Sequence, residues 1–526
     1  MMSLYNLYMK LARLHGWRAD LAMLLAGGVY ALAFPPLHAV VVLPVAFCLL
    51  ALAIDHAAGW RGAARRGFMF AMGLYTVGLY WLMYAILLRA DDFWWLVPLA
   101  SPGCALILAP LSALSAGLSR LVPRGTGRLM VLSALWTLTD MARVYVFSGF
   151  PWNPPGSVWE FPGLAGDIMI QPAAWIGVDG LTLLTCIVAL APLYGRMGRW
   201  ACLVLMVAWI GYGAVRFSSI HDTYLHNPEI VLVQGNVPET DKIAGNSDVA
   251  IFRRYLALTH QGVAQGLRQA GATRPVVFAW PESAFPGLLL EDDIARPMIM
   301  RAGQGAAAGI IGTVRWLEDD HHWRNSMVAL MPPDAAGTMV YDKAHLVPFG
   351  EYQPAFLPFH VVPGEGMTPG PGVRTWHLPG IAPVGPLICY EVIFSGQVAD
   401  PHDRPDWLMN STNDAWYGNS AGPRQHLAAV RLRAVEEGLP VARAANTGIS
   451  AVFDGRGHEL ARLGWDRQGV LVHAVPDALP CTFFGRYGRL VPLLLAGVMG
   501  LCGLWRGIVR DRTIWKKRAC PSGGSV

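Results

Sequence analysis

The chain has little charge for its length. Of its 526 residues only 15% are charged, 54% are hydrophobic, and the mean hydropathy is +0.37, whereas soluble globular proteins average roughly 25% charged residues. Charge is scarce in residues 1–216 and near the C-terminus, while the middle of the chain has an ordinary composition. This distribution argues against a wholly soluble protein and predicts a membrane protein with a water-facing module.

Patterns for metal binding, disulfides and nucleic-acid binding are also missing. The eight cysteines include no CxxC pair and no Cys/His cluster at metal-ligand spacing, so we expect no metal, no cofactor and no disulfide framework. The basic residues form no stripe but gather in short links between apolar runs, which argues against nucleic acid as a partner. No signal-peptide cleavage site is found, so we expect the first apolar run to remain as an anchor.

Eight apolar runs predict a bundle of membrane-spanning helices. A span needs roughly 20 apolar residues, and the first two runs are shorter and separated by Pro35-Pro36, so they form either one interrupted span or a tight pair. Counting them as two places every basic cluster on the inner side and leaves only Arg89 in the outer links, which fits the positive-inside rule. The runs are 21–34, 39–54, 68–88, 93–118, 129–147, 175–193, 200–215 and 490–505.

This count predicts the organisation of the whole chain. Residues 1–220 form a seven-span domain, residues 221–484 lie outside as a separate domain, and residues 485–526 form a last span with a basic inner tail. Two of the runs contain ionisable groups, which are costly in lipid and often functional. Asp140 and Arg143 lie three residues apart, which favours an intrahelical ion pair, and Asp179 has no assigned role.

The outer domain has the pattern of a layered α/β fold. Short buried strands are expected at 230–234, 275–279, 309–313, 326–330 and 385–389, with a helix at 249–270. Glu282, Lys343 and Cys389 each follow an apolar strand. Taken singly, they read as a helix cap, a solvated charge and a packed thiol. Together they supply a base, a cation and a nucleophile, which favours catalysis.

Longer motifs around these residues resemble the nitrilase superfamily. They are WPES at 280–283, YDKAHLVPFGEY at 341–352, ICYE at 388–391 and NSTNDAWYG at 410–418. The KxHLVPFGEY form, the GFPW link at 149–152 and the flanking apolar runs resemble, more narrowly, the apolipoprotein N-acyltransferase family. The resemblance covers nearly the whole chain and implies an αββα sandwich beside the α-helical multi-pass membrane domain.

The resemblance also implies a reaction and a set of roles. A phospholipid would donate an acyl chain to Cys389 as a thioester, and the N-terminal amine of a diacylglyceryl-cysteine apolipoprotein would accept it. The implied setting is the inner membrane of a bacterium, with the catalytic domain in the periplasm and the enzyme a monomer among membrane lipids. The implied site comprises Glu282 as base, Lys343 as oxyanion stabiliser, Cys389 as nucleophile, and Asn325, Glu351, Tyr390, Glu391 and Trp416 in support.

One position departs from the family pattern, and two other functions compete. Ile243 stands where the family often has tryptophan, which puts a lipid-contacting role of that loop in doubt. A membrane-anchored amidase or nitrilase would use the same three residues with water as acceptor, although one anchor would then suffice. A non-catalytic transporter or scaffold would have no need of an intact Glu–Lys–Cys set.

Overall fold

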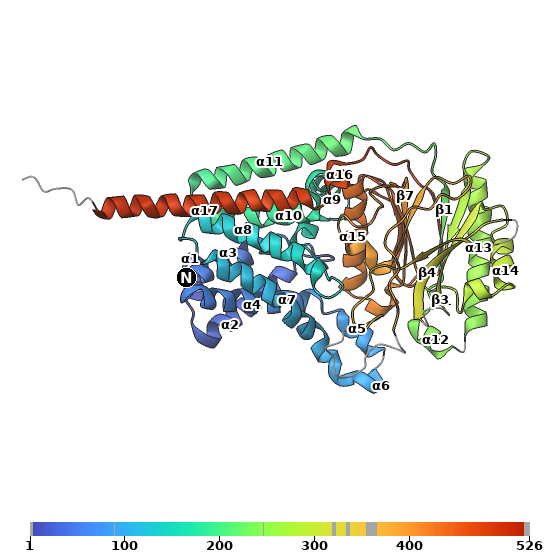
Figure 1. The fold of residues 1–526 in the computed structure, drawn as a ribbon, viewed down its shortest axis with the longest axis horizontal. Coiled ribbons are helices and arrows are strands. Elements are labelled where there is room, and N and C mark those ends of the chain that lie inside the picture. The colour runs from blue at the N-terminus through green and yellow to red at the C-terminus, as the bar shows by residue number, and fades with distance from the viewer. Residues whose placement is uncertain are drawn as a thin grey trace, which may run out of the picture.

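The computed structural model describes residues 4–88, 90–245, 247–317, 322–332, 337–353 and 366–519. Figure 1 shows two parts set end to end along the longest axis of the molecule. One part is a helical bundle formed by residues 4–219 and the last helix, and the other contains two β sheets between helices. The larger helices of the bundle are α2 (Gly16–Ala31), α3 (Val42–His56), α4 (Gly59–Gly78), α7 (Ala100–Ser119), α8 (Thr126–Met141), α10 (Ala173–Ala189), α11 (Arg196–Ser219) and α17 (Leu490–Ala519); shorter ones are α1 (Leu4–Ala12), α5 (Leu82–Leu87), α6 (Ala90–Phe93) and α9 (Leu164–Met169).

Each of the eight larger helices overlaps one of the eight expected apolar runs. Among the described residues, three helical stretches are long and apolar enough to cross a membrane: Ala90–Ser119, Arg196–Ser219 and Leu490–Val509. Helices α2 and α3 contact each other, as the tight-pair alternative predicts. The chain is therefore a membrane protein by its helices, and the number of eight spans stays a prediction.

Two sheets form the other part. The first has the order β11-β1-β2-β3-β4-β5, and the second has the order β10-β9-β8-β7-β6. Strands β1, β2 and β3 run parallel, as do β6, β7 and β8, while antiparallel strands complete each sheet. The strands are β1 (Glu229–Gln234), β2 (Val276–Ala279), β3 (Ala308–Leu317), β4 (His322–Leu330), β5 (Gly337–Asp342), β6 (Val384–Ile388), β7 (Trp407–Thr412), β8 (Val441–Ala445), β9 (Ser450–Phe453), β10 (Glu459–Leu463) and β11 (Gly469–Ala474). All five expected strand positions fall on these strands.

Alternating side chains divide the sandwich into four layers. In β1, Ile230 and Leu232 join the core between the sheets, whereas Val231 and Val233 pack beneath the outer helix α13 (Asp248–Ala270). This period of two is what a strand buried on both faces requires. Helix α14 (Ala295–Ala302) lies beside α13, and α15 (Ala421–Glu437) covers the second sheet. The layers are therefore helix, sheet, sheet and helix, which is the expected αββα arrangement.

Helix α15, the fourth layer of the sandwich, lies between the second sheet and the helical bundle (Figure 1). It contacts α10 of the bundle on one side and the second sheet on the other. Ion pairs reinforce the bundle near this interface: Arg143 binds Asp140 at 2.6 Å, as expected for residues three apart, and Arg489 before α17 binds Asp179 at 2.8 Å. The second sheet and its helix are thus held directly against the bundle.

Candidate active site

Cys389 occupies a sharp turn at the end of β6. The strand ends at Ile388, a short 3-10 helix begins at Cys389, and the backbone φ of Cys389 is +50°. A non-glycine residue in this left-handed region is strained and is usually held there by its surroundings. The Glu391 carboxylate holds the turn by accepting the Ile388 N–H at 2.7 Å. The thiol is thereby placed at the strand end, as in other nucleophile turns.

Glu282 and Lys343 meet Cys389 from the first sheet. Glu282 follows β2, Lys343 follows β5, and the Lys343 Nζ lies 3.1 Å from the Glu282 Oε1. Cys389, 4% exposed, lies close enough to Glu282 for the two groups to interact electrostatically. The backbone N–H of Asn413 donates to the other Glu282 oxygen at 2.9 Å. The structure therefore places the three residues together between the two sheets.

The charges at this contact set the resting protonation states. Burial raises the pKa of Glu282, but the charge of Lys343 and the hydrogen bonds that Glu282 accepts outweigh burial, so the pKa of Glu282 is below its ordinary value. Burial lowers the pKa of Lys343, but Glu282 and Glu351 raise it well above its usual range. Burial and the Glu282 charge raise the pKa of Cys389. At rest, a neutral thiol thus lies beside an ionised carboxylate.

Glu351 and Asn325 complete the contacts around the lysine. The Glu351 Oε1 lies 2.8 Å from the Lys343 Nζ, and its Oε2 accepts the Val347 N–H at 2.8 Å. The Asn325 amide donates to Glu282 at 2.7 Å and to Glu351 at 3.0 Å. Two carboxylates therefore share one ammonium and one amide, which orients all four groups.

Glu391 joins the cysteine turn to the lysine loop. Besides Ile388, it accepts the Ala344 N–H at 2.7 Å and the Tyr341 O–H at 2.8 Å. Burial raises the pKa of Glu391 to about 7, although these donors and Lys343 lower it. Because one carboxylate holds both loops, the separation of Cys389 from Lys343 depends on it.

Two aromatic residues expected at the site occupy different positions. Tyr390 donates its O–H to the Gly149 carbonyl at 2.5 Å, which ties the cysteine turn to the link between α8 and α10, and its ring lies beside Phe150. Trp416 is half-buried in the turn that follows β7, three residues after Asn413. Tyr390 therefore connects the site to the bundle, whereas Trp416 packs against the apolar core that the bundle shares with the second sheet.

Ile243, the position that departs from the family pattern, belongs to helix α12 (Glu239–Ala244). The Ile243 side chain lies outside the described residues, but its neighbour Lys242 donates from Nζ to the Ser283 carbonyl at 3.2 Å. Burial lowers the pKa of Lys242. A second, partly buried lysine thus lies beside the Glu282 loop, and the sequence interpretation did not include it.

A buried polar cluster behind Cys389 also escaped the sequence interpretation. It consists of Asp414, His426 and Arg443, each fully buried, and His426 reaches the Cys389 carbonyl at 3.1 Å. Asp414 lies in a motif already noted, but His426 and Arg443 lie on elements without a reactive pattern. Within the described residues, no group of three or more His, Cys, Asp or Glu side chains is arranged to hold a metal ion.

Comparisons with known proteins agree with this architecture. The family described as carbon-nitrogen hydrolase matches residues 264–479, and the apolipoprotein N-acyltransferase N-terminal domain matches residues 26–191. Curated proteins named apolipoprotein N-acyltransferase are similar over nearly the full length. The one from Rhodopseudomonas palustris is 35% identical, covering 93% of this chain and 96% of its own, and the one from Bradyrhizobium diazoefficiens is 33% identical, covering 94% and 96%. A solved amidase of the nitrilase superfamily from Nesterenkonia is 18% identical, covers 51% of this chain and 97% of its own, and has a TM-score of 0.36.

Together these findings define the class of protein. A carbon-nitrogen hydrolase fold joined to apolar helices is a membrane-bound, nitrilase-like enzyme. The chain belongs to the apolipoprotein N-acyltransferase family. The family resemblance found in the motifs is therefore confirmed.

Proposed function

We propose that this acyltransferase moves a fatty acyl chain from a phospholipid, through a Cys389 thioester, to the N-terminal amine of a diacylglyceryl-cysteine apolipoprotein. Family membership makes lipoprotein N-acylation its activity. The observation that carries the assignment of roles is the buried contact of Glu282, Lys343 and Cys389. It unites a base and a cation from the first sheet with a nucleophile from the second sheet, which faces the bundle.

The first half-reaction loads the enzyme. Glu282 takes the proton of the Cys389 thiol as the sulfur attacks the carbonyl carbon of the phospholipid ester. The Lys343 ammonium, held in place by two carboxylates, faces the oxyanion that forms. When the C–O bond breaks, Glu282 returns the proton to the departing alkoxide, which leaves as a lysophospholipid.

The second half-reaction transfers the acyl chain from Cys389 to the acceptor amine. A neutral α-amine, whose ordinary pKa is near 8, attacks the thioester carbonyl, and Lys343 again stabilises the oxyanion. Glu282 takes a proton from the nitrogen and passes it to the sulfur as the C–S bond breaks. The products are an amide on the acceptor and the free thiol, so the enzyme returns to its starting state.

The competing hydrolytic function differs only in the acceptor. In an amidase or nitrilase, water would take the place of the amine, and a single anchor would hold the enzyme at a membrane. The curated relatives that cover nearly the whole chain are named acyltransferases, which supports the amine. The same relatives speak against a non-catalytic transporter or scaffold.

We place the sandwich on the periplasmic side of the inner membrane of a bacterium and the enzyme as a monomer. The distribution of basic residues supports this orientation. Cys481, which is exposed, offers a test. A membrane-impermeant maleimide added to spheroplasts should label wild-type protein and leave Cys481→Ala less labelled. Labelling of Cys481 only after permeabilisation would reverse the topology.

The function is tested with a phospholipid that carries deuterated acyl chains and a synthetic diacylated lipopeptide with a free N-terminal cysteine amine. Purified enzyme should add the mass of one deuterated acyl chain to the lipopeptide. Cys389→Ala should form neither product nor acyl-enzyme, whereas Cys481→Ala should behave as wild type. Release of deuterated fatty acid with an unchanged lipopeptide would establish a hydrolase instead.

A further inference from the structure

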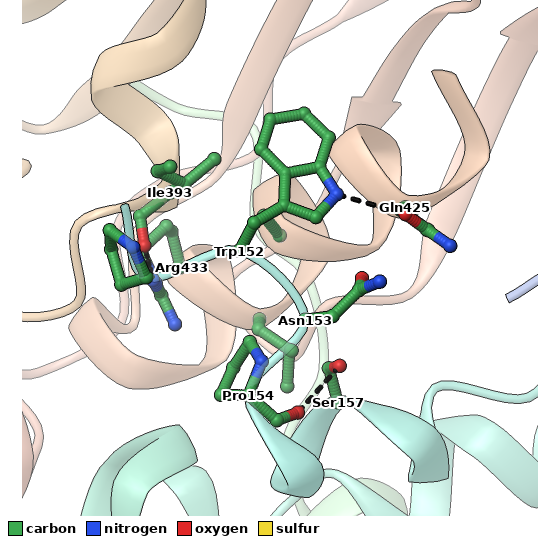
Figure 2. A pocket seen from close by; sticks show the side chains of 10 residues that line it. Trp152, Asn153, Pro154, Ser157, Ile393, Gln425 and Arg433 are labelled. Atoms are coloured by element: carbon green, nitrogen blue, oxygen red, sulfur yellow. Dashed lines mark hydrogen bonds between the residues drawn. The ribbon is translucent and has the colours of Figure 1, made fainter. Parts of the chain in front are cut away.

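Two adjacent polar residues of helix α15, Gln425 and His426, contact different parts of the molecule. Gln425 is buried against the helical bundle. Its Oε1 accepts the indole N–H groups of Trp81 at 3.0 Å and Trp152 at 2.9 Å, and the second of these bonds is visible in Figure 2. Its Nε2 donates to the carbonyls of Pro35 at 3.2 Å and Gly78 at 3.4 Å. One amide thus uses all four of its bonds on three separate segments of the bundle.

His426 serves the nucleophile. Its Nε2 lies 3.1 Å from the Cys389 carbonyl, and its Nδ1 lies 2.8 Å from the Asp414 Oδ1. Because a carbonyl only accepts, Nε2 is the donor. Arg443 binds the other Asp414 oxygen at 2.7 Å, so the ring is held from behind. His426 therefore restrains the strained main chain of Cys389 through its carbonyl.

Helix geometry connects these two contacts. Adjacent helical residues are separated by a rise of about 1.5 Å and a turn of about 100°, so Gln425 and His426 point to different neighbours from one rigid position. The distance between the bundle contacts and the Cys389 carbonyl is consequently fixed by a single helical step. Neither side chain touches a reacting atom, so both are positioning residues.

We propose that Gln425 and His426 position the nucleophile for a lipid-borne donor, with Gln425 setting its place relative to the bundle and His426 setting its main chain. The inference rests on the proposed function, because only a donor anchored in the bilayer has a fixed place relative to the bundle. A donor in solution approaches Cys389 freely. Gln425 is therefore a determinant of donor choice, whereas His426 is needed for every donor.

The test compares two acyl donors on the full-length enzyme. Water-soluble p-nitrophenyl butyrate acylates Cys389 with release of p-nitrophenol, which is measured by absorbance. The deuterated phospholipid in mixed micelles acylates the same thiol, and this product is measured by mass spectrometry. Gln425→Met should keep the ester rate within about twofold and lower the phospholipid rate about tenfold or more, since four modest hydrogen bonds are lost. The ratio of the two rates cancels any loss of folded enzyme.

The histidine variants give a second, independent result. His426→Asn should lower both rates about tenfold, because its short amide does not reach the Cys389 carbonyl. His426→Gln should recover much of both rates, because its amide nitrogen reaches the place of Nε2. Exposed neighbours on α13 provide matched controls: His260→Asn and Gln261→Met should match wild type with both donors.

Each outcome decides between positioning and general structure. An equal loss with both donors in Gln425→Met overturns the role in donor choice, and His426→Gln as slow as His426→Asn overturns the carbonyl contact. Wild-type enzyme that accepts the ester but never the phospholipid refutes the proposed function itself, and the inference falls with it. That failure is seen without any variant, so the two failures are distinguishable.

Discussion

Replacing Lys343 with methionine tests the proposed oxyanion stabiliser most directly. The Lys343 Nζ lies 3.1 Å from Glu282 and 2.8 Å from Glu351, and the side chain is 1% exposed. Methionine keeps most of the length but removes the charge. Losing one oxyanion donor typically costs about 3–4 kcal/mol, which is roughly a 100- to 1000-fold slower acylation. Breaking a buried ion pair also destabilises the fold, by about 3–5 kcal/mol.

A second substitution separates these two effects. Lys343→Met leaves two buried carboxylates without a cation, and adding Glu351→Gln removes one of the negative charges. The double variant should regain thermal stability but stay as slow as the single variant. The measurements are the single-turnover release of p-nitrophenol and the unfolding midpoint temperature. If the double variant recovers the wild-type rate, Lys343 only balances carboxylates and the assignment is wrong.

Three further substitutions address the turn, the buried acids and the bundle. Tyr390→Phe loses the bond to Gly149 and should slow acylation about fivefold, the value of one hydrogen bond; an unchanged rate would contradict this. Burial, and then repulsion from a neighbouring glutamate, raises the pKa of Glu437 from 4.5 to about 7. The folded state therefore binds this proton more tightly, so stability falls by about 3 kcal/mol as pH rises from about 4.5 to 7; Glu437→Gln should flatten that fall in unfolding midpoints, and parallel curves would refute it. A Cβ on Gly73 would lie 1.8 Å from a backbone oxygen of α2, whereas one on Gly103 meets nothing within 4 Å; Gly73→Ala should lower the unfolding midpoint and Gly103→Ala should not.

The reactive groups could be predicted because each follows an apolar strand. Strands β2, β5 and β6 end one to three residues before Glu282, Lys343 and Cys389 respectively. A polar residue directly after a buried strand can be recognised from the neighbouring sequence alone, and so can the motifs around it. The contact among the three residues follows from the sandwich, because both sheets present these strand ends to one another.

The length of the bundle helices explains why the number of spans could not be settled in the same way. Helix α2 has 16 residues and α3 has 15, fewer than the roughly 20 needed to cross a bilayer unaided. The apolar run 68–88 divides into α4, which ends at Gly78, and α5, which begins at Leu82. Trp81, in the turn between them, is buried against Tyr417 of the sandwich. Hydropathy records the apolar character but not this break.

The positioning residues had no local signal at all. Helix α15 is buried along almost its whole length, yet it carries Gln425, His426, Arg431 and Arg433. From its sequence alone, such a helix is expected to face solvent. Its polar residues can be buried because distant segments supply their hydrogen-bond partners, as Pro35 does for Gln425 from 390 positions earlier. Buried polar networks of this kind depend on every partner being present. They become visible only when both parts of the molecule are in place.

The reactive residues and the positioning residues contribute differently to donor choice within the family. Motifs at strand ends specify what chemistry is done, since Glu282, Lys343 and Cys389 touch the reacting atoms in the proposed mechanism. The position of Cys389 relative to the bundle depends on α15, whose hydrogen bonds to Trp81 and Trp152 hold the second sheet on the bundle. A relative could therefore keep every reactive motif and still differ in its lipid donor, through an exchange at the position of Gln425 alone.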